Sequence, residues 1–302
     1  MTLAAGVQWH EAYTAVNNYG RLMVGGISVG GSVGSSGGWL AGGGHSALSP
    51  SYGLGKILED HLARQINRPI EGVDNALEIS IVLSTGEFLT VNNYQDSDLF
   101  WALRGGGGST YGIVTSVTYR TYPSVPTQLY TYQANITNSS VLPELVGGLL
   151  RYQTQFTDDG WGGYGTISGQ QVGFFYFAPN MTNETAIATT QAWHNYTTSL
   201  APFGVVSAEQ TYYSPSWYEL YQFLFSNGVQ NGGNLLFTSR LLSRDTVANN
   251  YAEVAEVLLN CSASFKYVLY SSLCLDQFGI MVVRVVRLQA GRSASSVPTL
   301  LG

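Results

Sequence analysis

The residues whose types and spacing could do chemistry form a glycine-rich stretch from Gly25 to Gly55. Small hydroxyl side chains, including Ser35 and Ser36, lie between its glycines, and charges are few. Glycine permits positive φ angles and lets a ligand lie against the backbone without meeting a Cβ atom. Loops of this kind offer bare N–H groups to anions, so the stretch is typical of a cradle for a diphosphate.

A flexible Gly/Ser linker is the alternative interpretation of the same stretch, because linkers also favour glycine, serine and other polar residues. Trp39, Leu40, Leu48 and Tyr52 argue against it, since a linker does not need bulky apolar residues at intervals. The sequence therefore favours an ordered segment that holds a ligand.

Composition narrows the class of protein. The chain has 302 residues, of which 45% are hydrophobic and only 11% are charged, so it can bury a large core. A net charge of -6 disfavours nucleic acid and anionic membranes as partners, because both need clustered Lys and Arg. No apolar run approaches the length of a membrane-spanning helix.

Periodicity and turn residues predict the elements that must position the glycine-rich stretch. A second glycine-rich loop follows the helix that Asp98 is expected to cap. The predicted elements are a helix over 7–20, a short strand over 21–24, a hairpin over 76–91 with its turn at Thr85 and Gly86, a helix over 98–104 and a strand over 113–122.

Four motifs give the first half of the chain a specific resemblance. They are GVQWHEAY at 6–13, GGWLAGGGHSALSPSYGLG at 37–55, VDNALEISIVLSTGE at 73–87 and DLFWALRGGGGSTYGIVTSVTYRTYP at 98–123. In this order they resemble the flavin domain of the berberine-bridge-enzyme-like FAD-linked oxidases, in the vanillyl-alcohol oxidase / p-cresol methylhydroxylase superfamily. The secreted fungal branch is the most similar.

The resemblance implies an α+β fold with two domains. Residues 1–123 are expected to form part of a p-cresol-methylhydroxylase-type FAD-binding domain. Residues 124–302 are expected to form part of a substrate domain, an antiparallel sheet flanked by helices. The cofactor is FAD, and the residues expected to bind it by this resemblance are Val33, Gly34, Ser36, Gly37, Gly38, Gly42, Gly43, Gly44, His45, Ser46, Tyr52, Gly53, Ile113 and Val114.

The activity implied by the resemblance is that of an oxidase. Family members transfer a hydride from an alcohol, sugar or amine carbon to flavin N5, and O2 is the expected acceptor. The partners are thus a small-molecule substrate and O2. No catalytic base can be assigned, and the four histidines show no metal-ligand spacing, so no metal is expected.

Several departures from the family pattern matter. Family members carry a further glycine-rich loop and a flavin-linked histidine before the equivalent of Gly6. They also end with a further segment of strand and helix, and the resemblance of this chain to the family fades after Ser262. Both cysteines lie far from 30–33, where some relatives link the flavin a second time, so a doubly linked flavin is not expected. Residues 56–72 look like an insertion, and we interpret them as a retained intron or, alternatively, a surface loop or short helix.

The second half of the chain has its own pattern. Strands are predicted over 127–136 and 161–178, and helices over 182–200 and 245–259, the latter with Asp245 as its cap. Aromatic residues could line a substrate pocket, but aromatic residues at helical spacing are more often core, which we favour for any single one. They are Tyr212, Tyr213, Trp217, Tyr218 and Tyr221.

Six N-x-[ST] triplets favour an extracellular glycoprotein, although residues 1–10 do not resemble a signal peptide. Their asparagines are Asn135, Asn138, Asn180, Asn183, Asn195 and Asn260.

Two hypotheses of different class follow. The chain is either a FAD-dependent oxidoreductase or a non-catalytic fragment that keeps the flavin loop without holding FAD stably.

Overall fold

The computed structural model describes residues 1–53, 72–226, 235–264, 267–273 and 280–288. The chain divides into two compact units. Unit 1 comprises residues 1–126 and 215–230, and unit 2 comprises residues 127–214 and 231–302. The boundary near residue 126 lies close to the predicted one, whereas 215–230 returns to the first unit. The assignment of the two parts as FAD and substrate domains stays a prediction.

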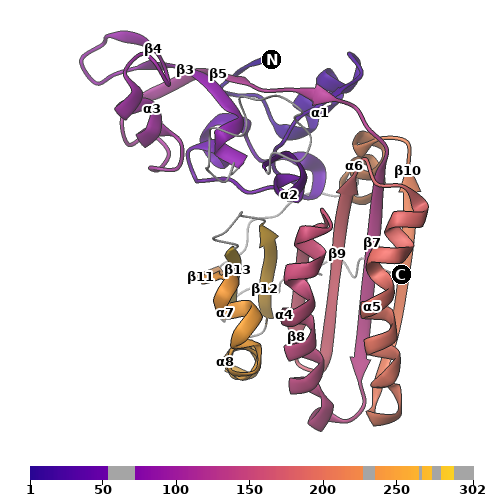
Figure 1. The fold of residues 1–302 in the computed structure, drawn as a ribbon. Coiled ribbons are helices and arrows are strands. Elements are labelled where there is room, and N and C mark those ends of the chain that lie inside the picture. The colour runs from indigo at the N-terminus through magenta and orange to yellow at the C-terminus, as the bar shows by residue number, and fades with distance from the viewer. Residues whose placement is uncertain (54–71, 227–234, 265–266, 274–279, 289–302) are drawn as a thin grey trace. The chain divides into compact units, whose positions relative to one another are not determined.

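A four-stranded antiparallel sheet forms the centre of unit 1, in the order β1-β5-β3-β4 (Figure 1). Its buried face carries Ile79, Ile81, Val91 and Val117, each 0% exposed. Alternation along β3 and β5 places these side chains on one face. The strands are β1 (Thr2–Ala4), β3 (Ala76–Val82), β4 (Phe88–Asn92) and β5 (Ile113–Tyr119), and β2 (Arg21–Leu22) pairs separately with β6 (Tyr122–Pro123).

The first helix of unit 1 is the one that apolar spacing predicted. Helix α1 (Trp9–Asn17) begins with a capping box between Gln8 and Glu11, in which the Gln8 backbone N–H donates to the Glu11 carboxylate at 2.8 Å. Its buried residues are Trp9, Ala12, Tyr13 and Val16, and Gly20 follows with a φ of 64°. This glycine lets the chain reverse into β2.

The remaining helical segments of unit 1 are short. The predicted Asp98 cap is wrong: the N-cap of α3 (Ser97–Leu103) is Asp96, and Asp98 lies in the first turn. An acidic residue there still favours the positive end of the helix dipole. The others are the 3₁₀ segments η1 (Val29–Gly31) and η4 (Gly72–Asn75), the π-helical η2 (Ser35–Leu40), α2 (Ser49–Gly53) and α6 (Trp217–Phe225).

Unit 2 is built on a seven-stranded antiparallel sheet in the order β10-β7-β9-β8-β12-β13-β11. Prediction and structure agree on β7, and the predicted 161–178 segment is a hairpin of two strands. The sheet also includes two strands after Ser262. The strands are β7 (Thr127–Ile136), β8 (Gly162–Ser168), β9 (Gln171–Pro179), β10 (Val205–Ser214), β11 (Leu235–Ser243), β12 (Tyr267–Leu273) and β13 (Ile280–Leu288).

Helices cover one face of this sheet (Figure 1). The predicted helix over 245–259 is two helices, and its cap is Ser243, whose hydroxyl accepts from the Thr246 backbone N–H. Ser243 precedes Asp245 and takes the capping position first. The helices are α4 (Leu142–Asp158), α5 (Asn183–Ser199), α7 (Arg244–Asn249) and α8 (Tyr251–Ser264), with short 3₁₀ segments η5 (Ser139–Val141) and η6 (Ala201–Phe203).

Aromatic side chains make up much of the core between helices and sheet. Tyr130, Phe174 and Trp193 are all buried, and Phe174 stacks on Tyr176 with ring centroids 4.3 Å apart. Large rings bury more apolar area than aliphatic side chains, so they stabilise a sheet–helix interface strongly. The unit is thus held by its own core.

Candidate functional site

The glycine-rich stretch of unit 1 is ordered in its described part, which excludes the linker interpretation there. The backbone N–H of Trp9 donates to Val33 O at 3.1 Å, and that of Ser35 donates to Val7 O at 2.9 Å. Tyr119 Oη donates to Ser35 O at 2.7 Å. Helix α1 and strand β5 therefore fix the segment from two sides.

Trp39 anchors the middle of the stretch. Its ring is 5% exposed and lies 5.0 Å from the ring of Trp9, at an angle of 79°. Its indole N–H donates to His45 O at 3.0 Å, and a Cβ atom on Gly44 would lie 2.3 Å from the ring. Gly44 is therefore required for packing.

The second glycine-rich loop lies against the first. The backbone N–H of Gly107 donates to Ala41 O at 2.9 Å, and a Cβ atom on Gly105 would lie 3.4 Å from Gly43 Cα. A Cβ atom on Gly108 would lie 3.6 Å from Gly37 O. The two loops thus form one continuous surface of glycine backbone.

This glycine surface is accessible. Its exposed glycines are Gly37, Gly38, Gly42, Gly43, Gly105, Gly106 and Gly108. Ile113 follows the second loop and is 70% exposed, an unusual state for an apolar strand residue. Bare N–H groups beside an exposed apolar side chain suit a ligand with a phosphate part and a flat ring.

One of these glycines, Gly37, is not required by packing or by its φ angle. A Cβ atom on Gly37 would have no atom within 4 Å, and its φ is not positive. Gly43, by contrast, has a φ of 74°, and a Cβ atom on Gly42 would lie 2.9 Å from Gly38 O. The conformation and packing of the described chain therefore leave the glycine at position 37 unexplained, and a ligand close to the backbone would explain it.

Several buried hydroxyl groups of the glycine-rich stretch lack partners in the described part of the chain. Within the described part of the chain, the side-chain oxygens of Ser36, Ser49 and Tyr52 are buried without a hydrogen bond. Burial, reinforced by the neighbouring Tyr122, raises the pKa of Tyr52 above its usual value, so its phenol stays protonated. Buried polar groups without partners also occur in the core of unit 2, for example at Tyr132, so these three do not by themselves mark a ligand site.

Positive charge at the second loop is already neutralised. Arg104, at the end of α3, lies over the Phe100 ring at 4.3 Å and donates from Nη1 to Asp74 Oδ1 at 3.1 Å. Backbone dipoles must therefore supply most of the attraction for an anion on this surface.

The structure brings together only part of the predicted FAD-binding set. Gly37 and Gly43 meet the second loop, and Gly42 is exposed beside Gly43. Ser46 and Tyr52 are buried, and Val33 and His45 are half-buried. Ile113 and Val114 begin β5 directly after the second loop. Gly105 to Gly108 were not among the predicted site residues, although the run of four glycines was visible in the sequence.

The five aromatic residues considered for a substrate pocket differ in burial. Trp217 and Tyr221 are buried in unit 1, where Tyr221 packs 4.7 Å from the Tyr13 ring, so both are core residues. Tyr213 is 55% exposed. Tyr212 and Tyr218 are half-buried.

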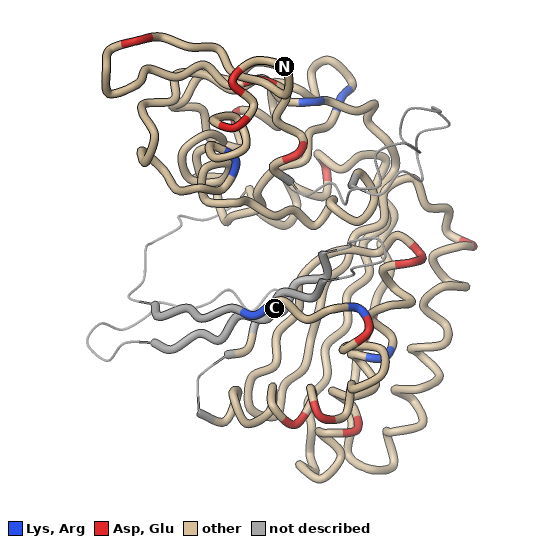
Figure 2. Tube along the Cα trace, turned by 60° about the vertical axis from the view of Figure 1, so that its left-hand side comes forward, with Lys and Arg blue, Asp and Glu red and all other residues tan. Residues whose placement is uncertain are grey.

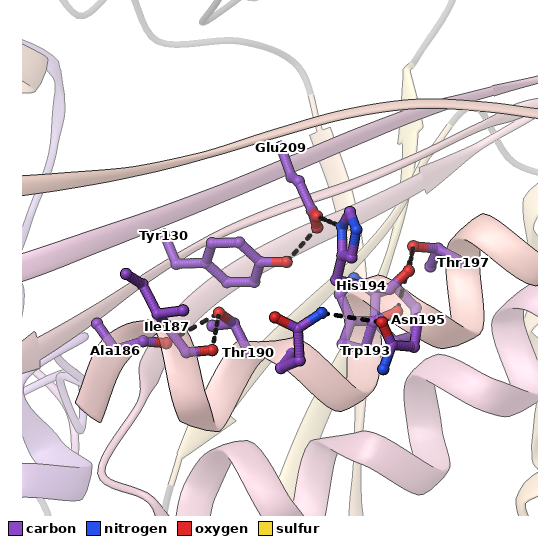
Figure 3. A network of polar contacts seen from close by, with 10 residues as sticks. Tyr130, Ala186, Ile187, Thr190, Trp193, His194, Asn195, Thr197 and Glu209 are labelled. Carbon is purple, nitrogen blue, oxygen red and sulfur yellow. Dashed lines mark hydrogen bonds and ion pairs between the residues drawn. The ribbon is translucent and has the colours of Figure 1, made fainter. Parts of the chain in front are cut away.

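Unit 2 holds a polar network that joins a helix to the sheet (Figure 3). Tyr130 Oη donates to one oxygen of Glu209 on edge strand β10, and the other oxygen contacts His194 Nδ1 on α5. Burial, then Glu209, raises the pKa of Tyr130 above its usual value. The buried phenol thus remains a donor, and the network fastens α5 to β10.

Other kinds of site find no support in the part of the chain that the structure describes. Figure 2 shows Asp and Glu dispersed along the trace, and no group of three or more His, Cys, Asp or Glu could hold a metal there. None of the helices in those residues is long and apolar enough to cross a membrane. Cys261 is a free thiol. Residues 56–71 of the predicted insertion lie outside the described residues.

Comparison with known proteins gives one consistent picture, although no protein-family profile matches the chain. An uncharacterised FAD-linked oxidoreductase of Arthroderma benhamiae is 32% identical over 265 residues, which are 85% of this chain and 43% of that protein. The VAO-type flavoprotein MtVAO615 of Myceliophthora thermophila superposes with a TM-score of 0.81 at 24% identity, over 97% of this chain and 53% of that one.

A carbohydrate oxidase of Microdochium nivale, solved with a substrate analogue, has a TM-score of 0.67 at 17% identity, over 99% of this chain and 64% of its own. The chain therefore spans about half the length of the relatives that it matches. The predicted α+β fold and the predicted resemblance are confirmed.

Proposed function

This chain is related over most of its length to FAD-linked oxidoreductases and has the fold of the VAO-type flavoproteins, and we propose that it binds FAD on the glycine surface of unit 1. FAD is the cofactor of these relatives. We propose further that the chain acts as an oxidoreductase on a small molecule, with O2 as the acceptor.

One observation carries the proposal: glycines from two distant loops form a single exposed backbone surface, and Gly37 in it has no role in the described fold. Peptide N–H groups on such a surface can donate to diphosphate oxygens without Lys or Arg. Ile113, at the start of β5, offers an apolar contact for a ring. The residues present therefore fit a dinucleotide such as FAD.

When bound, the flavin supplies the redox chemistry by accepting a hydride at N5 from an alcohol, sugar or amine carbon. The chain's own residues hold the two loops that are proposed to bind and orient the cofactor. Trp39, Gly44 and Tyr119 fix the backbone of the first loop, and the bond from Gly107 N–H to Ala41 O fixes the second loop beside it.

A surface for the substrate is proposed on unit 2. Strand alternation puts Thr131, Gln133 and Phe175 on the sheet face opposite the helices, because their neighbours Tyr130, Tyr132 and Phe174 belong to the helix-side core. Tyr164 pairs with Phe175, with ring centroids 5.7 Å apart. Partly exposed rings and amide groups suit stacking and hydrogen bonding to a hydroxylated substrate.

The reaction details and the cellular location are part of the same proposal. The hydride route, O2 as acceptor and an extracellular location follow from the family resemblance and from the six N-x-[ST] triplets.

The substrate class can be tested with the FAD-loaded chain under anaerobic conditions. Oligosaccharides, primary alcohols and secondary amines would each be mixed with it while the flavin absorbance is followed. Bleaching by one class, and recovery on admission of air, supports the proposal. A flavin that no class bleaches contradicts it.

A further inference from the structure

The six N-x-[ST] triplets differ sharply in local structure, although all six asparagines are exposed. Asn135 lies in strand β7, Asn183 and Asn195 in helix α5, and Asn260 in helix α8. Asn180 occupies a tight turn with a φ of 57°. Asn138 lies between β7 and η5, at the N-cap of η5.

Asn138 closes a turn with its own triplet. Its Oδ1 accepts from the Ser140 backbone N–H at 3.1 Å and from the Ser140 hydroxyl at 2.9 Å. A backbone N–H can only donate, so the accepting atom must be the amide oxygen. The amide nitrogen is therefore on the other branch of the planar group, on an exposed side chain.

Neighbouring loops of unit 2 hold this turn at the surface. Thr137 donates from its backbone N–H to Gly204 O at 2.8 Å, and Gln170 Nε2 donates to Ser139 Oγ at 2.9 Å. Contacts on both sides thus fix the triplet, and neither of them uses the Asn138 amide.

We propose that Asn138 carries an N-linked oligosaccharide. In this reaction Nδ2 bonds to the anomeric carbon of a sugar on a lipid-diphosphate donor. The bond from that carbon to the diphosphate oxygen breaks, the diphosphate leaves with the electron pair, and Nδ2 loses one proton. Hydrogen bonds from Ser140 to Oδ1 stabilise negative charge on the amide as this proton leaves. The turn is local, since it joins residues only two apart.

Asn195 provides the internal contrast. Its Oδ1 accepts from Gln191 Nε2 at 2.9 Å, and the hydroxyl of its triplet belongs to Thr197, which is 2% exposed. That hydroxyl donates to Trp193 O and His194 O within the helix. The triplet at 195–197 therefore cannot form the turn that the triplet at 138–140 forms.

The test uses the full chain, directed by a leader peptide into the secretory pathway of a yeast. Peptide N-glycosidase converts each glycan-bearing asparagine to aspartate, which peptide mass spectrometry locates. We expect conversion at Asn138 and a clearly lower converted fraction at Asn195.

Matched variants distinguish loss of the oligosaccharide from an effect on folding. Asn138→Asp keeps the oxygen that accepts from Ser140 but lacks the amide nitrogen, so the intact mass should lose one oligosaccharide. Ser140→Ala should lose it as well, whereas Ser140→Thr and Ser139→Ala should retain it. If a variant fails to be secreted, the peptide map of the unaltered chain still decides. An unconverted Asn138, or conversion at Asn195 equal to that at Asn138, overturns the proposal.

Discussion

Gly43 and Gly105 lie back to back, so that a Cβ atom on Gly105 would be 3.4 Å from Gly43 Cα. Both have positive φ angles, 74° for Gly43 and 119° for Gly105. The contact joins two loops that are far apart in sequence. The proposed cofactor surface therefore depends on a tertiary contact between two positions whose positive φ angles favour glycine.

Gly43→Ala should lower the free energy of unfolding. A left-handed backbone conformation costs a residue with a Cβ atom about 1–2 kcal/mol. Urea denaturation of the two chains would measure the difference. Gly37→Ala serves as the control and should not lower the midpoint, because alanine can adopt the conformation of that position without strain. Equal loss from both substitutions would contradict the assignment of positive φ as the cause.

Gly37→Ala should instead weaken FAD binding. A Cβ atom there meets nothing in the described chain but would stand on the exposed surface where the diphosphate is proposed to lie. Flavin fluorescence titration would give the change in dissociation constant. Gly6→Ala is the matched control, because its Cβ atom is equally unhindered but lies outside both loops. Unchanged affinity in Gly37→Ala would remove this surface from the site.

Tyr119→Phe should destabilise unit 1, because the Tyr119 hydroxyl donates to Ser35 O at 2.7 Å inside the core. Loss of one partner of a buried hydrogen bond costs about 1–3 kcal/mol. Tyr221→Phe is the control: Tyr221 is also buried, but its hydroxyl has no partner in the described part of the chain. Near pH 7, Tyr221→Phe should leave the free energy of unfolding, measured by chemical denaturation, almost unchanged.

Alkaline pH should destabilise the chain through its buried tyrosines. Burial, then the neighbouring Tyr218, raises the pKa of Tyr221 to about 12, above the value of about 10 for an exposed phenol. The unfolded chain therefore ionises first, so stability is fully present below about pH 10 and falls as the pH rises toward the folded value. Denaturation across the alkaline range should show this fall.

Tyr221→Phe should make the alkaline decline shallower by removing one such group. Tyr94→Phe should leave it unchanged, since the Tyr94 side chain is 99% exposed. An identical pH dependence in all three chains would show that the buried phenol is not the source.

Patterns among neighbouring residues were sufficient to predict single helices and strands. Apolar spacing and Gly20 predicted α1, and the strand predicted over 127–136 is β7 with the same bounds. Caps were less predictable, because neighbouring polar residues can each take the position: Asp96 rather than Asp98 occupies the N-cap of α3, and Ser243 rather than Asp245 caps α7.

Long-range contacts could not be read from the sequence. Helix α6 belongs to unit 1 because Tyr221 packs on Tyr13, a pairing that no local pattern encodes. The meeting of Gly43 with Gly105 is of the same kind. The sequence therefore predicted site residues mainly in the first loop, a prediction that remains to be tested, but it did not predict that the second loop lies against the first.

The absorbance spectrum of the purified chain with added FAD, after removal of free FAD and again after acid precipitation, tests the central proposal most directly. We expect flavin absorbance to stay with the folded chain and to pass into the supernatant on precipitation, which indicates non-covalent binding. A chain that retains no FAD would contradict the proposed site and favour a fragment that inherits the loops of its relatives without their cofactor.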